Sequence, residues 1–67
     1  MKYVVEYRNE HALDAWTIDE EFDKLSGAIE YAAKECIGNP RMKHRIIRMC
    51  EPEEVMVFPS IEKVLCD

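Results

Sequence analysis

The sequence predicts an α+β domain in which an antiparallel sheet, arranged ββαββ along the chain, carries one helix on one face. Apolar residues alternate with polar ones near the N-terminus, which is typical of a strand, and a central stripe with spacings of three and four indicates a helix. Two further β-compatible segments follow the helix. With 67 residues, of which 48% are hydrophobic and 34% charged, the chain is expected to form one α+β domain over 1–67.

The N-terminal half is expected to begin with a β-hairpin. Its first strand is expected over residues 2–8, where every second residue is an apolar Tyr or Val. A polar turn follows, and Trp16 and Ile18 would share one face of a second strand around residues 15–18. This strand is expected to fade in the acidic run 19–21.

One helix is expected over residues 24–37. Asp23 or Ser26 would cap its start, and Gly-Asn-Pro at residues 38–40 would end it. Its small side chains would allow it to lie close across a sheet. The apolar stripe consists of Leu25, Ala28, Ile29, Ala32 and Cys36.

The C-terminal half is expected to form a second hairpin. Residues 43–50 have apolar side chains on both sides of the pleat, which predicts a central strand. Residues 51–54 are expected to form a turn. Residues 55–58 would then form the returning strand, which Pro59 ends. Residues 60–65 fit either a short helical turn or an edge strand. A single helix leaves one sheet face uncovered, so that face is expected to be polar or to meet a partner.

The cysteine pattern and the strand-like N-terminus favour a protein that resides in a reducing cytoplasm. Cys36, Cys50 and Cys66 are odd in number and form no C-x-x-C pair, so neither a disulfide framework nor a zinc knuckle is expected. We expect Cys36 and Cys50 to be buried as small apolar residues and Cys66 to lie exposed near the end. No apolar stretch approaches the roughly 20 residues of a membrane span.

The formal net charge of −5 disfavours free-standing nucleic-acid binding and favours a protein partner with a basic surface. Neither acidic run has the D-x-D-x-D-G spacing of a calcium loop, so no metal and no cofactor are expected. Solvated turns are the alternative interpretation of these runs. The candidate partner-binding residues are Asp19, Glu20, Glu21, Asp23, Glu51, Glu53 and Glu54.

A basic cluster, Arg41, Lys43, His44, Arg45 and Arg48, falls on the expected central strand and the residues before it. Strand alternation would place Lys43 and Arg45 on one face and His44 and Arg48 on the other, which divides the patch. Cross-strand pairs with the acidic segments are therefore expected in place of a phosphate-binding surface.

No catalytic constellation is recognisable. His11 and His44 have no evident nucleophile beside them, and His44 and Cys50 would lie ~20 Å apart on one extended strand. An enzyme would require an ordered cluster of perturbed ionisable groups in a cleft.

One apolar pattern runs through most of the chain: Tyr3-x-Val5-x-Tyr7, Trp16, Phe22, Ala28-Ile29-x-x-Ala32-Ala33 and Arg45-Ile46-Ile47. It resembles the pattern of small accessory proteins of phages and prophages, whose acidic members of this size resemble anti-CRISPR inhibitors. The resemblance implies a protein that occupies a surface of a host surveillance complex, often its basic track for DNA, without catalysis and in the host cytoplasm. It assigns no role to any single residue, because that group has no common motif.

Size, acidity and the missing catalytic set together predict a non-enzymatic protein-binding module. It would dock on a basic protein surface as an inhibitor of a nucleic-acid-handling complex. The alternative is a small structural or assembly protein that homodimerises through its open sheet face or through an edge strand at residues 55–58.

Overall fold

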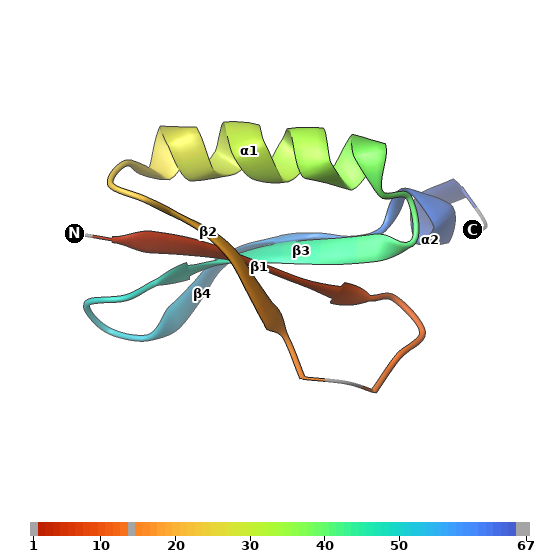
Figure 1. The fold of residues 1–67 in the computed structure, drawn as a ribbon, viewed down its shortest axis with the longest axis horizontal. Helices are drawn as coiled ribbons and strands as arrows, with labels where there is room; N and C mark the ends of the chain where they lie inside the picture. Colours follow the sequence, from red (N-terminus) through yellow and green to blue (C-terminus); the bar gives the residue numbers. More distant parts are fainter. Residues whose placement is uncertain (1, 14, 66–67) are drawn as a thin grey trace.

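The computed structural model describes residues 2–13 and 15–65, and it confirms the predicted α+β class. A long helix packs on one face of a four-stranded antiparallel sheet, and a short second helix lies near the C-terminal end (Figure 1). The elements are β1 (Tyr3–Asn9), β2 (Thr17–Phe22), α1 (Leu25–Gly38), β3 (Met42–Arg48), β4 (Glu53–Phe58) and α2 (Ile61–Leu65).

The strand order in the sheet is β2-β1-β3-β4. β1 and β3 form its centre and pair from Tyr3 opposite Arg48 to Asn9 opposite Met42. Because β2 and β3 both run antiparallel to β1, they are parallel to each other, and α1 is the crossover that joins them. The central strand predicted over residues 43–50 is therefore confirmed as central in the sheet, and it spans Met42–Arg48.

The core is a thin layer between α1 and the two central strands. Val5 and Ile46 are opposite each other on β1 and β3, and they pack against Ala28 and Ala32 of α1. The two alanines have the predicted role, since small side chains allow the helix to approach the sheet closely. Larger, partly buried residues surround this core: Tyr3, Phe22, Leu25, Ile29, Tyr31 and Phe58.

The second strand differs from the prediction. The prediction that this strand fades at residues 19–21 is wrong, because β2 runs through this segment to Phe22 and pairs with Val4 and Val5 of β1. β2 is an edge strand, so the carboxylates of Glu20 and Glu21 stay in water while the backbone pairs, and the charges therefore do not end the strand.

The start of α1 also differs from the prediction. Lys24 is the N-cap residue and makes no side-chain capping bond, so neither Asp23 nor Ser26 caps the helix. The end is as predicted. The Asn39 backbone N–H and side-chain Nδ2 both donate to the Glu35 carbonyl, at 2.9 and 3.0 Å.

The second hairpin turns earlier than expected. Residues 49–52 form the turn, in place of 51–54, and β4 starts directly after it. Cys50 is consequently exposed in this turn, and the prediction that it is buried is wrong. Cys36 is buried as predicted: its thiol donates to the Pro59 carbonyl at 3.3 Å, and burial raises the pKa of the thiol.

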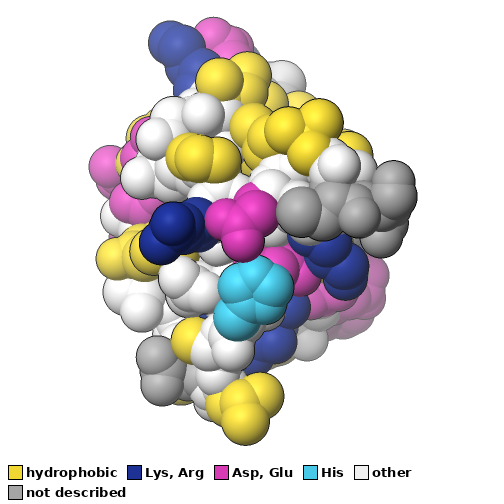
Figure 2. Space-filling view, turned by 90° about the vertical axis from the view of Figure 1, so that its right-hand side faces the viewer, with side chains coloured by type: hydrophobic (Ala, Val, Ile, Leu, Met, Phe, Trp, Pro, Cys, Tyr) yellow, Lys and Arg dark blue, Asp and Glu magenta, His cyan; other side chains and the backbone are white. Residues whose placement is uncertain are grey.

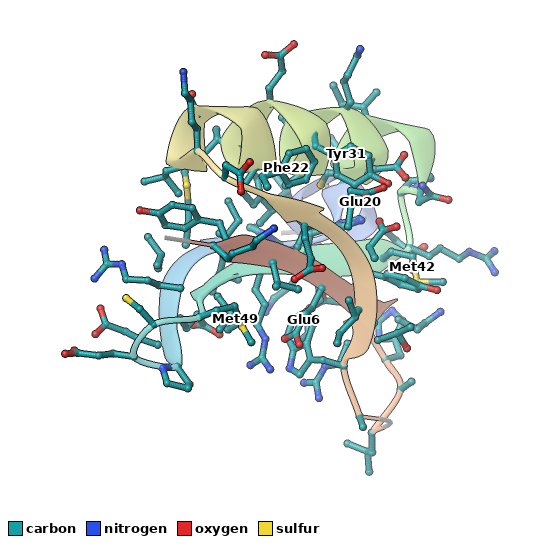
Figure 3. All side chains as sticks on the ribbon, turned by 60° about the vertical axis from the view of Figure 1, so that its left-hand side comes forward. Glu6, Glu20, Phe22, Tyr31, Met42 and Met49 are labelled. Carbon is teal, nitrogen blue, oxygen red and sulfur yellow. The ribbon has the colours of Figure 1, made fainter. Side chains whose placement is uncertain are left out.

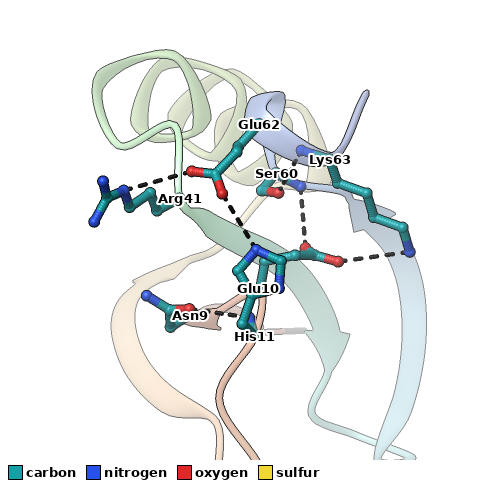
Figure 4. Close-up of polar contacts among 7 residues, drawn as sticks. All are labelled: Asn9, Glu10, His11, Arg41, Ser60, Glu62 and Lys63. Atoms are coloured by element: carbon teal, nitrogen blue, oxygen red, sulfur yellow. Dashed lines mark hydrogen bonds and ion pairs between the residues drawn. The ribbon is translucent and has the colours of Figure 1, made fainter. Parts of the chain in front are cut away.

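The sequence of residues 60–65 allowed either a short helical turn or an edge strand. The segment forms the helix α2, over Ile61–Leu65. Ser60 is fully buried and accepts the Lys63 backbone N–H at its Oγ, 3.1 Å away, so it caps this helix. The Glu10 carboxylate, 7% exposed, accepts the Ser60 N–H at 3.4 Å and pairs with Lys63 Nζ at 3.5 Å (Figure 4). Cys66 lies outside the described residues.

Glu62 connects α2 to two loops. Its carboxylate pairs with His11 Nε2 at 3.2 Å and with Arg41 Nε at 3.4 Å, and its backbone N–H donates to the Pro40 carbonyl at 3.0 Å (Figure 4). Figure 2 shows this end of the molecule, where acidic, basic and histidine side chains gather beside hydrophobic ones. The loop after β1 and the loop after α1 are thus held together by α2.

The Glu10 contacts predict a pH-dependent stability. Burial alone would raise the pKa of Glu10, but hydrogen bonds from Ser60 and the charges of Lys43 and Lys63 outweigh burial, and the pKa lies below its ordinary value of 4.5. A carboxyl group with a lowered folded pKa stabilises the fold above its unfolded pKa, and this stabilisation disappears as the pH falls through the folded pKa. Glu10→Gln should therefore lower the free energy of unfolding by about 1 kcal/mol at neutral pH.

Thermal unfolding of the wild type and Glu10→Gln between neutral pH and pH 3 checks this expectation. The stability difference between the two proteins should shrink below pH 4.5. Glu30→Gln, which removes the same charge from an exposed position of α1, is the matched control. A difference that stays constant across the pH range would contradict the role given to Glu10.

Candidate functional site

The structure separates the two predicted acidic runs. β2 and β4 are the opposite edges of the sheet, so the seven candidate residues do not form one surface. We call the run on and just after β2 the β2 acidic edge, and the run before and within β4 the β4 acidic edge. The first comprises Asp19, Glu20, Glu21 and Asp23, and the second comprises Glu51, Glu53 and Glu54.

Arginines of β3 neutralise most of the β4 acidic edge. Arg45 Nη1 lies 3.4 Å from Glu54, and Arg48 Nη1 lies 3.7 Å from Glu53. These are the cross-strand pairs that the sequence predicts for the basic segment. Glu51 remains exposed in the turn.

The β2 acidic edge is neutralised much less. Asp23 pairs with Lys2 at 3.5 Å, and both side chains are largely exposed, so this pair contributes little. Within residues 2–13 and 15–65, no ion pair is formed by Glu20 or Glu21, which are both exposed. Exposed carboxylates therefore lie along this edge of the sheet, and those of the consecutive residues Glu20 and Glu21 project to opposite faces.

Asp19 is directed to the helix side of this edge. The Tyr31 hydroxyl lies 3.1 Å from Asp19 Oδ1 and 3.2 Å from Glu35 Oε1, and its single proton can satisfy only one carboxylate at a time. Its ring packs against Phe22, with centroids 5.2 Å apart, between α1 and β2 (Figure 3). Burial, and then the two carboxylates, raise the pKa of the Tyr31 phenol well above its usual 10.0.

A surface pocket of about 310 Å³ opens beside this group, where the C-terminal half of α1 meets the sheet. We call it the α1–β2 pocket. Its lining residues are Tyr7, Asp19, Glu35, Asn39, Met42 and His44.

His44 forms the buried part of the pocket lining. It is 2% exposed, and its Nδ1 has no hydrogen-bond partner in the part of the chain that the structure describes. Burial lowers the pKa of His44, while the carboxylates of Asp19 and Glu35 oppose that shift. The imidazole is therefore neutral at pH 7.

Tyr31, Glu35 and His44 were not among the site residues predicted from the sequence. The spacing of four between Tyr31 and Glu35 places both on one side of a helix, which is a signal that the sequence does carry. Their meeting with Asp19 depends on where α1 lies over β2, and that placement has no local sequence signal. His44 was interpreted as one member of a basic cluster and was set aside as a catalytic base because no nucleophile was evident beside it.

The open sheet face carries a separate cluster around Trp16. Arg45 lies 4.3 Å, Arg8 5.0 Å and Lys43 5.5 Å from the centroid of the indole ring. Arg45 also pairs with Glu6 at 2.7 Å, and Glu6 projects from the face away from α1 (Figure 3). As predicted, Lys43 and Arg45 share this face, and carboxylates compensate much of its charge.

The other polar candidates remain apart. His11 lies in the exposed loop after β1, His44 is buried under α1, and Cys50 lies in the turn after β3. Among the described residues, no group of three or more His, Cys, Asp or Glu side chains is arranged to hold a metal ion. No helix of the described chain is long and apolar enough to cross a membrane.

Comparison with known proteins adds no assignment to this geometry. No protein-family model matches the chain, and no curated protein and no solved structure is significantly similar to it.

The carboxylates around Tyr31 predict a phenol that resists ionisation. The chain contains three tyrosines, so the contribution of Tyr31 is isolated by subtracting the ultraviolet titration curve of Tyr31→Phe from that of the wild type. The phenylalanine retains the ring that packs on Phe22. This difference should appear only well above pH 10.0 in the folded protein and should return to the ordinary range in denaturant. The same midpoint in both conditions would contradict the shared hydrogen bond.

Proposed function

We propose that this chain is a non-enzymatic protein-binding module that docks its β2 acidic edge on a basic surface of a partner protein. The partner we propose is a nucleic-acid-handling complex in the cytoplasm. By covering a basic track, the chain would exclude the phosphate backbone and act as an inhibitor.

The main observation in favour is the uneven compensation of charge. On the β2 acidic edge, Glu20 and Glu21 carry exposed carboxylates without an ion pair in the described chain, whereas Glu53 and Glu54 on the opposite edge pair with arginines. Uncompensated charge on one side gives the molecule an oriented field that raises the encounter rate with an oppositely charged surface. This difference supports the β2 acidic edge as the proposed docking surface.

An anti-CRISPR activity is one form that this inhibition could take. It rests on the resemblance of the apolar pattern to phage accessory proteins. The docking proposal does not depend on it, because charge, edge exposure and size support docking on a basic protein in any host.

Binding is favoured over catalysis by the composition of the α1–β2 pocket. The pocket does bring together ionisable groups with shifted pKa values, as an active site would. Its lining, however, contains no serine, threonine, cysteine or lysine, and among the described residues none of its carboxylate, imidazole and phenol groups is hydrogen-bonded to another lining side chain that could activate it as a nucleophile. Its carboxylates, amide and neutral imidazole are suited to holding a ligand.

Homodimerisation through the open sheet face is the alternative, and the structure gives it less support. Trp16 and the three cations around it cover the middle of that face, which leaves apolar residues such as Ile18 and Val57 separated at its two sides. A stable homodimer generally needs a larger continuous apolar area.

Sedimentation equilibrium or light scattering distinguishes the two functions. Docking on a different protein predicts a monomer of 7.9 kDa at every concentration up to the millimolar range. A concentration-dependent dimer that Ile18→Asp or Val57→Asp disrupts would support assembly through the sheet instead.

The charge asymmetry predicts which edge controls association. Two variants each neutralise three carboxylates: Glu20→Gln/Glu21→Gln/Asp23→Asn on the β2 acidic edge, and Glu51→Gln/Glu53→Gln/Glu54→Gln on the β4 acidic edge. Each changes the net charge by the same amount, so they are matched. The first should slow association with the partner about 10-fold at low ionic strength and flatten its salt dependence, whereas the second should change both much less.

The measurement begins with affinity capture from a cell lysate, using the wild type and both variants as baits. Association rates of the captured complex are then compared at two ionic strengths. Equal effects of the two triple variants on the association rate would mean that net charge, and not the β2 acidic edge, controls association. Recovery of no specific partner by the wild type would contradict the proposed function.

A further inference from the structure

Acceptors outnumber donors among the polar side chains that line the α1–β2 pocket, where the donors are the Tyr7 hydroxyl, the Asn39 amide and the single N–H of the neutral His44. The carboxylates of Asp19 and Glu35 share a single proton from Tyr31, which leaves most of their lone pairs without a donor. Asn39 uses its Nδ2 to donate to the Glu35 carbonyl, so its amide oxygen is the free polar atom of that side chain. A ligand for this pocket must therefore supply several donors.

His44 provides an independent observation. The residue lines the pocket although it is only 2% exposed, and its Nδ1, which is shielded from solvent, has no hydrogen-bond partner among the described residues, which costs free energy. Because the imidazole is neutral, Nδ1 accepts a hydrogen bond when the proton is on Nε2. Burial of the ring in the core does not explain why this nitrogen lacks a hydrogen-bond partner.

The end of α1 adds to the negative potential. The pocket includes Asn39, the C-cap residue, and therefore lies at the negative end of the helix dipole. No basic residue lies in the last turn of α1, and no lysine or arginine lines the pocket. Two carboxylates and a helix C-terminus thus face a space without a cation of the chain itself.

The size and walls of the pocket limit the ligand further. A volume of about 310 Å³ is at the low end of the range of about 300–1,000 Å³ typical of ligand sites, which suits one side chain better than a larger molecule. Tyr7 and Met42 supply an aromatic and an apolar wall. Such walls suit an aliphatic stem or a flat cationic group.

We propose that the α1–β2 pocket binds the guanidinium group of an arginine side chain presented by the partner. This inference rests on the proposed function and names the group that the basic surface inserts. The β2 acidic edge would guide the encounter, and the pocket would hold one arginine in a fixed position.

Arginine fits this pocket better than lysine. The guanidinium is planar and carries five N–H donors, so it can bond the two carboxylates and a third acceptor at the same time. It is also more weakly hydrated than an ammonium group, which lowers the cost of entering a partly buried space. The acceptors come from three elements, α1, β2 and β3, and a branched donor can reach more of them than a point charge.

The test is a ¹⁵N–¹H NMR titration of the full chain with N-acetyl-L-arginine amide. Saturable shifts are expected at Asp19, Glu35, Asn39 and His44. N-acetyl-L-citrulline amide, which has almost the same shape without the charge, should cause no saturable shift there. N-acetyl-L-lysine amide should bind severalfold more weakly. Citrulline or lysine amide that binds as tightly as arginine amide would overturn the assignment.

Matched variants locate the site. Glu35→Gln should weaken arginine amide binding about 10-fold, because it removes one charge-assisted acceptor. Glu30→Gln, on the same helix but outside the pocket lining, should leave binding unchanged. Unchanged affinity in Glu35→Gln would overturn the proposal. If that variant fails to fold, the comparison of arginine with citrulline on the wild type decides the question alone.

The two proposals fail separately. Arginine amide binding is measured on the isolated chain, and the Glu20→Gln/Glu21→Gln/Asp23→Asn variant should retain it while losing fast association with the partner. Arginine binding without partner docking would contradict the proposed function only. Salt-dependent docking without arginine selectivity would contradict the pocket assignment only.

Discussion

Close packing of α1 on the two central strands is the contact on which the rest of the structure depends. The side chains of Ala28 and Ala32 are small, so the helix lies directly over Val5 and Ile46. One helix cannot cover four strands, and the edge strands are covered on this side only where larger residues extend toward them. Tyr31 fills that space along β2 and, farther along the helix, the α1–β2 pocket remains open.

The open face of the sheet is stabilised in a different way. It has no helix, and its centre is covered by long charged side chains that pack on Trp16 and pair with carboxylates. Arg45 illustrates this arrangement: it packs over the indole ring and reaches both Glu6 and Glu54. Its aliphatic stem and planar head together cover apolar surface that a small domain cannot bury in a second layer.

Much of the fold could be predicted from the sequence, because its period changes from two to about 3.6 at α1 and back again after it. The continuation of β2 through residues 19–22 could not, because backbone pairing with β1 holds Glu20 and Glu21 in an edge strand whose side chains need no burial. The acidic residues of the candidate site could be identified by their charge. The pocket could not be predicted, since Tyr31 and Glu35 meet Asp19 only through the placement of one element over another.

The order of the strands decides which acidic edge pairs with the arginines of β3. β3 carries the arginines and lies beside β4, so Arg45 and Arg48 reach the carboxylates of the β4 acidic edge. β1 separates β3 from β2, and the same arginines are therefore kept away from the β2 acidic edge. Two runs of similar composition thus differ in their electrostatics: carboxylates of the β4 acidic edge pair with arginines across the sheet, whereas Glu20 and Glu21 of the β2 acidic edge are exposed without an ion pair in the described chain.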